Sequence, residues 1–153
     1  MSEHRASIEW QLAGEFRYET YSRSHGIDFG RGVRVAGNAA ADNIPKTVAA
    51  AAGVDPEQQF VASLSSCHML WFLHLASRKN FVVERYVDEA SGVLGKNAEG
   101  TEAMTRVTLR PVVTFSGVPP SVEDNMKLHE KAHQRCFIAN SVKTEIILEP
   151  GIA

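Results

Sequence analysis

The sequence predicts a single α+β domain over residues 1–153, with secondary-structure elements in the order βββ-α-ββ-α-β. Three observations predict this class. A capped, strongly apolar helix begins after Asp55, a second capped helix begins after Ser121, and residues 104–115 alternate between apolar and polar side chains. With 153 residues, of which 44% are hydrophobic, the chain is long and apolar enough to build one substantial core.

The N-terminal third is expected to contain three strands and then a loop. Residues 8–22 favour two strands about a turn at Ala13-Gly14, and residues 26–35 favour a third. Residues 36–53 are rich in Ala, Gly and Asn and favour a long loop. Loops of that length are more often functional or mobile than idle.

The first helix is the clearest local signal in the sequence. Asp55 can cap it, Pro56 suits its first position, and Gln58 stands three residues after the cap. We expect this helix to run to about Arg78, apolar and therefore buried on nearly every side. Because a domain of this size rarely encloses a helix completely, we expect a second subunit to cover its remaining face.

The rest of the chain is expected to supply three more strands. Residues 81–95 and 104–115 favour strands joined by a turn at 96–100, and residues 142–148 favour the last strand. Pro111 lacks a backbone N–H, which indicates an edge strand or a bulge at that point.

The second helix is expected to carry both apolar and titratable side chains on one face. Ser121 begins it as a cap, and spacings of four, three, four and three residues place five side chains on one face. These are Val122, Met126, His129, His133 and Cys136.

Composition excludes several classes of protein. The net charge is −2 and no basic stripe is present, so we expect no nucleic-acid partner. Two cysteines do not make a secreted disulfide scaffold, and the first residues lack a signal-peptide core. His68 and His74 interrupt the apolar helix, so we do not expect a membrane span. We expect a cytoplasmic protein whose cysteines are reduced at rest.

The two cysteines are the first candidates for chemistry. As structural residues they would be small buried hydrophobes; as a pair, Cys67 and Cys136 could pass through a sulfenic acid to a disulfide. Both interpretations remain open from position alone. His129 and His133 could join Cys136 as zinc ligands, but their spacing matches no strong metal motif, and we expect neither a metal nor another cofactor.

Three charged residues have ordinary interpretations when taken alone. Glu57 is a first-turn acid that complements the helix dipole. Arg23 and Arg31 stand beside loop glycines and would normally be solvated surface residues.

A family resemblance adds to these patterns. The segment DPEQQFVASLSSC, which ends at Cys67, resembles the first cysteine segment of the OsmC/Ohr family of osmotically induced and organic hydroperoxide resistance proteins. The segment HQRC, which ends at Cys136, resembles the second, and the resemblance extends from about Arg17 to Leu148. Phe137 stands where the family commonly has proline and His68 where it often has phenylalanine, which favours an OsmC-like branch.

The resemblance implies an intertwined homodimer, with a long buried central helix, that reduces organic hydroperoxides to alcohols. It implies that Cys67 is the peroxidatic thiol and Cys136 the resolving thiol, reopened by a small or protein-bound dithiol. Glu57 then occupies the position of a glutamate that orients a catalytic arginine. The best match for that arginine is Arg23, and Arg31 is the alternative.

Two further expectations concern the shape of the site. Phe60, Leu64 and Trp71 would surround Cys67 with apolar groups and favour an organic substrate over hydrogen peroxide. Glu57 lies ten residues before Cys67, about 15 Å along a helix, so it is expected to come from the other subunit. The alternatives are a binding protein of the same fold with a non-catalytic cysteine pair, and a zinc protein.

Overall fold

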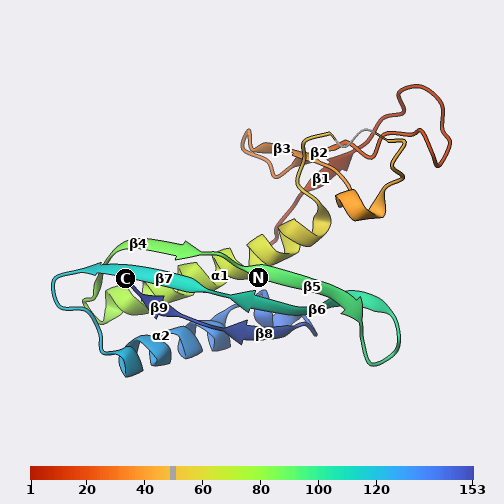
Figure 1. Ribbon diagram of the computed structural model, residues 1–153. Helices are drawn as coiled ribbons and strands as arrows, with labels where there is room; N and C mark the ends of the chain where they lie inside the picture. Colours follow the sequence, from red (N-terminus) through yellow and green to blue (C-terminus); the bar gives the residue numbers. More distant parts are fainter. Residues whose placement is uncertain (49–50) are drawn as a thin grey trace. The chain divides into compact units, whose positions relative to one another are not determined.

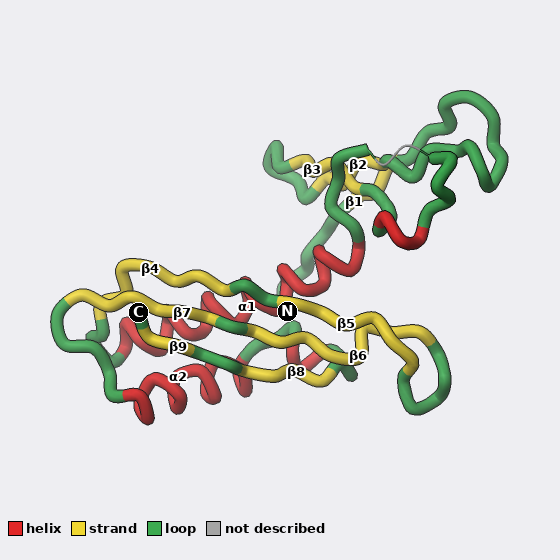
Figure 2. The backbone as a smooth tube through the Cα atoms, in the orientation of Figure 1, coloured by secondary structure: helices red, strands yellow, loops and turns green. Residues whose placement is uncertain are grey.

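The computed structural model describes residues 1–48 and 51–153, so Ala49 and Ala50 of the predicted loop lie outside the described residues. The chain divides into two compact units, Met1–Gln59 and Phe60–Ala153. We describe each unit by itself (Figures 1 and 2). The α+β class is confirmed, and so is the order of elements when each broken strand described below is counted as one.

The first unit contains a small antiparallel sheet in the order β1-β2-β3. Its strands are β1 (Ser7–Glu9), β2 (His25–Asp28) and β3 (Arg34–Gly37), followed by a short 3-10 helix at Ala41–Asn43. The two expected strands within residues 8–22 reduce to β1 alone. Trp10 instead donates its indole N–H to the carbonyl of Ser22 at 2.7 Å and closes a loop.

The strand expected over residues 26–35 is wrong, because the segment folds as a β2–β3 hairpin. Gly30, Arg31 and Gly32 all have positive φ, at 78°, 53° and 79°. Glycine adopts that region without strain, and two glycines around one residue allow the chain to reverse there.

Helix α1 (Pro56–Arg78) begins and ends as predicted. Gln58 donates its backbone N–H to the Asp55 carboxylate at 2.6 Å, and the Gln58 side chain accepts from the Asp55 N–H at 3.2 Å. This is the reciprocal capping box that the sequence indicated.

Within one chain, burial of α1 is confined to one side. The fully buried residues Leu64, His68, Phe72 and Ala76 form a single stripe, one residue in four. Leu70, on another side, is 63% exposed. By length and composition, α1 is the one helix among the described residues that could cross a membrane, a criterion that core helices also meet. Its stripe serves as core here, since it packs on the sheet and on the second helix.

The second unit is built on three long strands, each interrupted once. They are β4–β5 (Val82–Asp88, Ser91–Lys96), β6–β7 (Glu102–Leu109, Pro111–Ser116) and β8–β9 (Glu145–Leu148, Gly151–Ile152). The interruptions divide the layer into two three-stranded sheets, β5-β6-β8 and β4-β7-β9, which follow one another along the strands (Figure 1). In both sheets, the central strand comes from β6–β7.

Arg110 holds the three interruptions together. Its backbone N–H donates to Asp88 at 2.6 Å, while its guanidinium donates to Glu149 at 2.9 Å and to Ser91 at 2.9 Å. Pro111 therefore marks a break in a central strand, and the expected edge position is wrong. The break lets a proline stand where no ladder hydrogen bond needs its missing N–H.

Helix α2 (Val122–Arg135) is capped by Ser121, whose hydroxyl accepts from the Asp124 N–H at 3.1 Å. Of the five side chains expected to share one face of this helix, Val122 and Met126 are exposed, whereas His129 and Cys136 are buried. The buried residues are Asn125, Leu128, His129 and Ala132. Leu128 and Ala132 pack against Phe72 of α1 and Val113 of β7, so α1, α2 and one sheet face share a core.

Candidate active site

The second unit brings the two cysteines together from different helices. Cys67 lies midway along α1, and Cys136 directly follows α2. Both are free thiols, and Cys67 lies near enough to Cys136 to be one of the causes that raise the pKa of Cys136. Cys67 is half-buried, whereas Cys136 is 1% exposed. A reagent from solution therefore meets Cys67 first.

The end of α2 fixes the position of the buried sulfur. Cys136 caps the helix through its N–H, which donates to the carbonyl of His133 at 3.1 Å. The chain then turns into a short 3-10 helix at Ala139–Ser141. The Ala139 N–H donates to the Cys136 Sγ at 3.4 Å, and the Asn140 N–H donates to the Cys136 carbonyl at 3.0 Å. Backbone hydrogen bonds thus hold Cys136 on both sides of the turn, and one of them reaches its sulfur.

Burial also decides the charge state of Cys136. Desolvation, followed by the hydrogen bond with Cys67, raises the pKa of Cys136 to about 11, and the Ala139 N–H offsets only part of this rise. At neutral pH the Cys136 side chain is therefore a protonated thiol. Since the thiolate is the nucleophile, Cys136 is protected from external oxidants and suited to a second, internal step.

Aromatic groups stand one helical turn beyond Cys67. The Trp71 ring meets Phe137 edge-on, with 5.6 Å between centroids, and the Arg135 guanidinium lies 5.6 Å from the Trp71 ring centroid. Of the three residues expected to line a substrate pocket, Leu64 is instead 1% exposed and belongs to the core. Phe60 lies at a recess of about 670 Å³ beside the β5–β6 turn.

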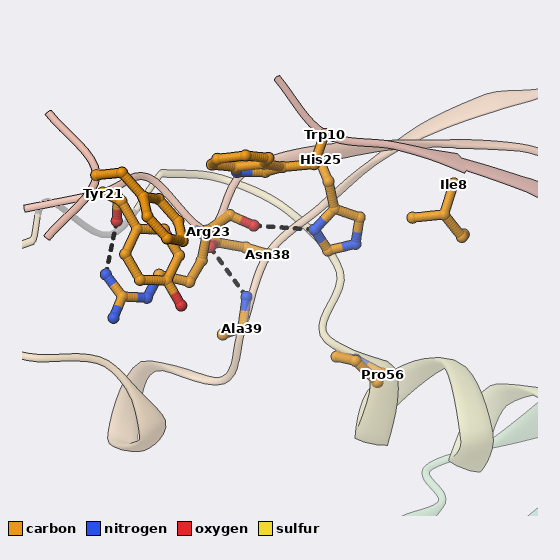
Figure 3. Close-up of a pocket in the computed structure, with 9 residues that line it drawn as sticks. Ile8, Trp10, Tyr21, Arg23, His25, Asn38, Ala39 and Pro56 are labelled. Carbon is orange, nitrogen blue, oxygen red and sulfur yellow. Dashed lines mark hydrogen bonds between the residues drawn. The ribbon is translucent and has the colours of Figure 1, made fainter. Parts of the chain in front are cut away.

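Arg23 belongs to the first unit, where it lines a recess of about 460 Å³ (Figure 3). Its guanidinium donates to the carbonyls of Tyr21 at 2.6 Å and Tyr18 at 2.8 Å, and lies 3.6 Å from the Tyr21 ring centroid. The recess is walled mainly by apolar groups: Ile8, Trp10, Phe16, Tyr21, His25, Asn38, Ala39 and Pro56. Arg31, the alternative, sits exposed at the tip of the β2–β3 hairpin.

Glu57 lies in the first turn of α1, where the helix N-terminus favours a negative charge. Its Oε2 atom is buried and has no hydrogen-bond partner among the described residues. Within the described residues of the first unit, no ion pair joins Glu57 to Arg23. A buried carboxylate oxygen without a hydrogen-bond partner favours pairing with a cation.

A buried pair of histidines was missed by the sequence reasoning. His68 Nε2 and His129 Nδ1 are 3.0 Å apart, and the two rings are parallel within 2°. The side chains are 1% and 0% exposed. The only available signal was that His68 follows Cys67 and that His129 falls on the face of the second helix that ends at Cys136.

The histidine pair is uncharged at neutral pH. Burial, and then the nearby His133, lowers the pKa of His68 to about 4; burial, and then His68, lowers the pKa of His129 to about 3. One nitrogen must donate and the other accept, which two neutral rings satisfy. His129 thus contacts His68 through Nδ1, while its Nε2 is buried without a hydrogen-bond partner among the described residues. No group of three or more potential metal ligands is found among residues 1–48 and 51–153.

Comparisons with known proteins address the family directly. A family model described as OsmC-like protein matches residues 49–150. An OsmC-like protein of unknown function from Vibrio cholerae is 44% identical, with a TM-score of 0.93 over 98% of this chain and 99% of that one. No curated protein matches the chain.

More distant structures share the fold. The organic hydroperoxide resistance protein OhrB of Bacillus subtilis is 18% identical, with a TM-score of 0.62 over 97% of this chain and 98% of that one. An organic hydroperoxide resistance protein OsmC from Legionella pneumophila is 14% identical, with a TM-score of 0.64 over 100% and 99% of the two chains.

Proposed function

The chain belongs to the OsmC-like family, and we propose that it is a thiol peroxidase that reduces organic hydroperoxides to alcohols. One observation carries the proposal. Two free thiols from different helices are close neighbours, one of them half-buried and the other fully buried. A cysteine with only a structural role needs no second thiol beside it, whereas a two-step redox cycle does.

The chemistry divides between the two sulfurs. The Cys67 thiolate attacks the terminal oxygen of the hydroperoxide, the O–O bond breaks, and the departing alkoxide takes up a proton to become the alcohol. Cys67 is left as a sulfenic acid. Cys136 then attacks the Cys67 sulfur, and the leaving hydroxide takes the Cys136 proton and departs as water. An external dithiol reduces the resulting disulfide and is itself oxidised.

We assign the activating cation to Arg23. A guanidinium beside Cys67 would favour the thiolate and donate hydrogen bonds to the peroxide oxygens. Glu57 would hold that guanidinium in a bidentate orientation. Among the described residues of the first unit, Oε2 of Glu57 is buried without a partner and Arg23 has no carboxylate partner, which supports this pairing.

We further propose a homodimer with composite sites, in which Arg23 and Glu57 of one chain serve Cys67 of the other. Helix α1 is continuous from Pro56 to Arg78, so Glu57 and Cys67 of one chain are about 15 Å apart along its axis. The exposed Leu70 on the same helix supports an additional partner surface.

The recess around Arg23 supports an organic substrate. Its walls include Trp10, Phe16 and Tyr21, which offer apolar and aromatic surface next to a cation. Ligand sites commonly combine such walls with a few polar groups that fix orientation. An alkyl or aryl hydroperoxide satisfies both parts, whereas hydrogen peroxide has no apolar part to bind.

A peroxidase assay tests the proposal. We expect the purified protein to turn over cumene and tert-butyl hydroperoxide faster than hydrogen peroxide, with dihydrolipoamide or dithiothreitol as reductant. Cys67→Ser should abolish turnover, and Cys136→Ser should leave a Cys67 sulfenic acid that dimedone traps. Turnover that survives Cys67→Ser, or a wild-type protein without turnover, would favour a binding protein whose cysteine pair is not catalytic.

A further inference from the structure

We propose that the buried His68–His129 pair is a positioning device that sets helix α2 against helix α1 so that Cys136 can reach Cys67. The proposal rests on the proposed function only in requiring that the two thiols form a disulfide. The two histidines touch neither the peroxide nor the reacting oxygen. Their role is in the step that closes the Cys67–Cys136 disulfide.

The pair is placed on the same two helices as the thiols. His68 directly follows Cys67 on α1, and His129 precedes Cys136 by seven residues, about two turns along α2 and on the same face. Apart from the contact between the thiols, it is the side-chain hydrogen bond that joins these helices among the described residues. A shift of either helix that changes the approach of the sulfurs therefore also strains this bond.

The surroundings leave the pair little freedom. The Phe72 ring stacks on His129 with 4.1 Å between centroids and 20° between planes. Leu128 and Ala132, both fully buried, fill the core on either side of His129 along α2. Close-packed interiors transmit displacement rather than absorb it.

Stability alone does not explain why a polar pair occupies this position. Apolar side chains of similar volume would fill the core without desolvating four ring nitrogens. A hydrogen bond supplies direction, which apolar contacts lack, and buried polar pairs are known to fix helix register. Register is what disulfide closure needs, since the two Cα atoms must lie about 4.4–6.8 Å apart with a torsion near 90°.

The test measures disulfide closure without any peroxide. An aryl disulfide such as 5,5′-dithiobis(2-nitrobenzoic acid) reacts with the Cys67 thiolate, forming a mixed disulfide and releasing one thionitrobenzoate. Cys136 then attacks the Cys67 sulfur and releases the second. The first phase reports access to Cys67, and the second reports closure.

Two double variants provide a matched comparison. In His68→Gln/His129→Asn the amide groups stand near the positions of Nε2 and Nδ1 and keep the hydrogen bond. In His68→Asn/His129→Gln the same two amides are exchanged, so one falls short of its position and the other overshoots, and any bond between them forms only if the helices shift. The two proteins have identical composition and no titratable group at either site. We expect the first phase to agree within about threefold in both, since access to Cys67 does not change.

The closing phase should separate the variants. Because misplacement by about 1 Å costs on the order of 10²-fold in rate, the exchanged pair should close at least about tenfold more slowly than wild type. The aligned pair should close within about threefold of wild type. Equal closure rates in the two variants would overturn the proposal, and so would slowing of both phases by the same factor.

The aryl disulfide test and the peroxidase assay can fail independently of each other. A wild-type protein that closes its disulfide with the aryl reagent but turns over no hydroperoxide would contradict the peroxidase assignment alone. If the exchanged pair fails to fold, His68→Leu/His129→Leu keeps the core filled and removes the bond. The proposal then requires slow closure in the leucine protein at an unchanged first phase.

Discussion

Cys67 and Cys136 differ in behaviour although they are chemically the same residue. Their difference follows from position: one thiol lies half-buried in the middle of a helix, the other fully buried where a helix ends. Desolvation keeps the second protonated, as its raised pKa of about 11 indicates. Residue identity alone could not have predicted this division, because it depends on which neighbours exclude water.

At the residue scale, Arg23 and Arg31 provide a matched pair. We expect Arg23→Met to lower kcat/KM for cumene hydroperoxide by about 10²-fold or more, since a charged donor aimed at the reacting oxygens is lost. Arg31→Asn, which tolerates the left-handed backbone at the hairpin tip, should stay within about twofold of wild type. Steady-state kinetics of the two variants measures this, and a larger loss in Arg31→Asn would move the catalytic cation to the hairpin.

At the element scale, the capping residues predicted the helix starts more accurately than the side-chain patterns predicted the strands. Asp55 with Gln58, and Ser121, located both helix starts because a cap depends on residues a few positions apart. The hairpin at residues 26–35 was missed because its turn relies on backbone torsions. The sequence also did not indicate which side of α2 faces the core, because histidine and valine give no reliable indication of burial.

The histidine pair gives the helices a pH-dependent link. The pKa values of His68 and His129 in the folded state, about 4 and about 3, lie below the ordinary value of 6.5. The unfolded chain therefore binds protons first as the pH falls. Stability from the neutral pair is fully present above about pH 6.5 and is lost as the pH falls toward 4 and then 3.

We expect the urea midpoint to fall between pH 7 and pH 5, with a slope of up to about 1.4 kcal/mol per pH unit for each histidine. In His68→Gln/His129→Asn this part of the slope should disappear. The other titratable groups nearby are His133 on α2 and Tyr86 on β4, which faces Asp88. Burial raises the pKa of Tyr86, so it stays neutral throughout this range. An unchanged slope in the double variant would assign the effect to groups outside the pair.

At the scale of the whole molecule, the overall class and element order could be predicted, whereas the buried surroundings of the two thiols, including the His68–His129 pair, could not. The apolar length of α1 predicted extensive burial, yet one chain buries only a stripe of it. Leu70 remains exposed because the sheet and α2 cover a single side. We propose that a second chain buries the rest of the helix, and one sequence does not describe where that chain lies.

Mixed dimers test the composite site. We expect light scattering to give a mass about twice 16.8 kDa for each parent variant. Cys67→Ser and Glu57→Ala homodimers should both be inactive. A heterodimer purified through two different affinity tags should regain one of its two sites, because the intact Cys67 of one chain meets the intact Glu57 of the other. Verified heterodimers without activity would mean that each site forms within one chain or does not use Glu57.

The two-cysteine cycle is tested most directly by the products of a single turnover. Reduced wild-type protein would be mixed with one equivalent of cumene hydroperoxide in the absence of reductant, and alcohol and peptides would be quantified together. The cycle predicts one equivalent of cumyl alcohol and one Cys67–Cys136 disulfide within the same chain. Alcohol formed without that disulfide, bridges only between chains, or a disulfide without alcohol would contradict it.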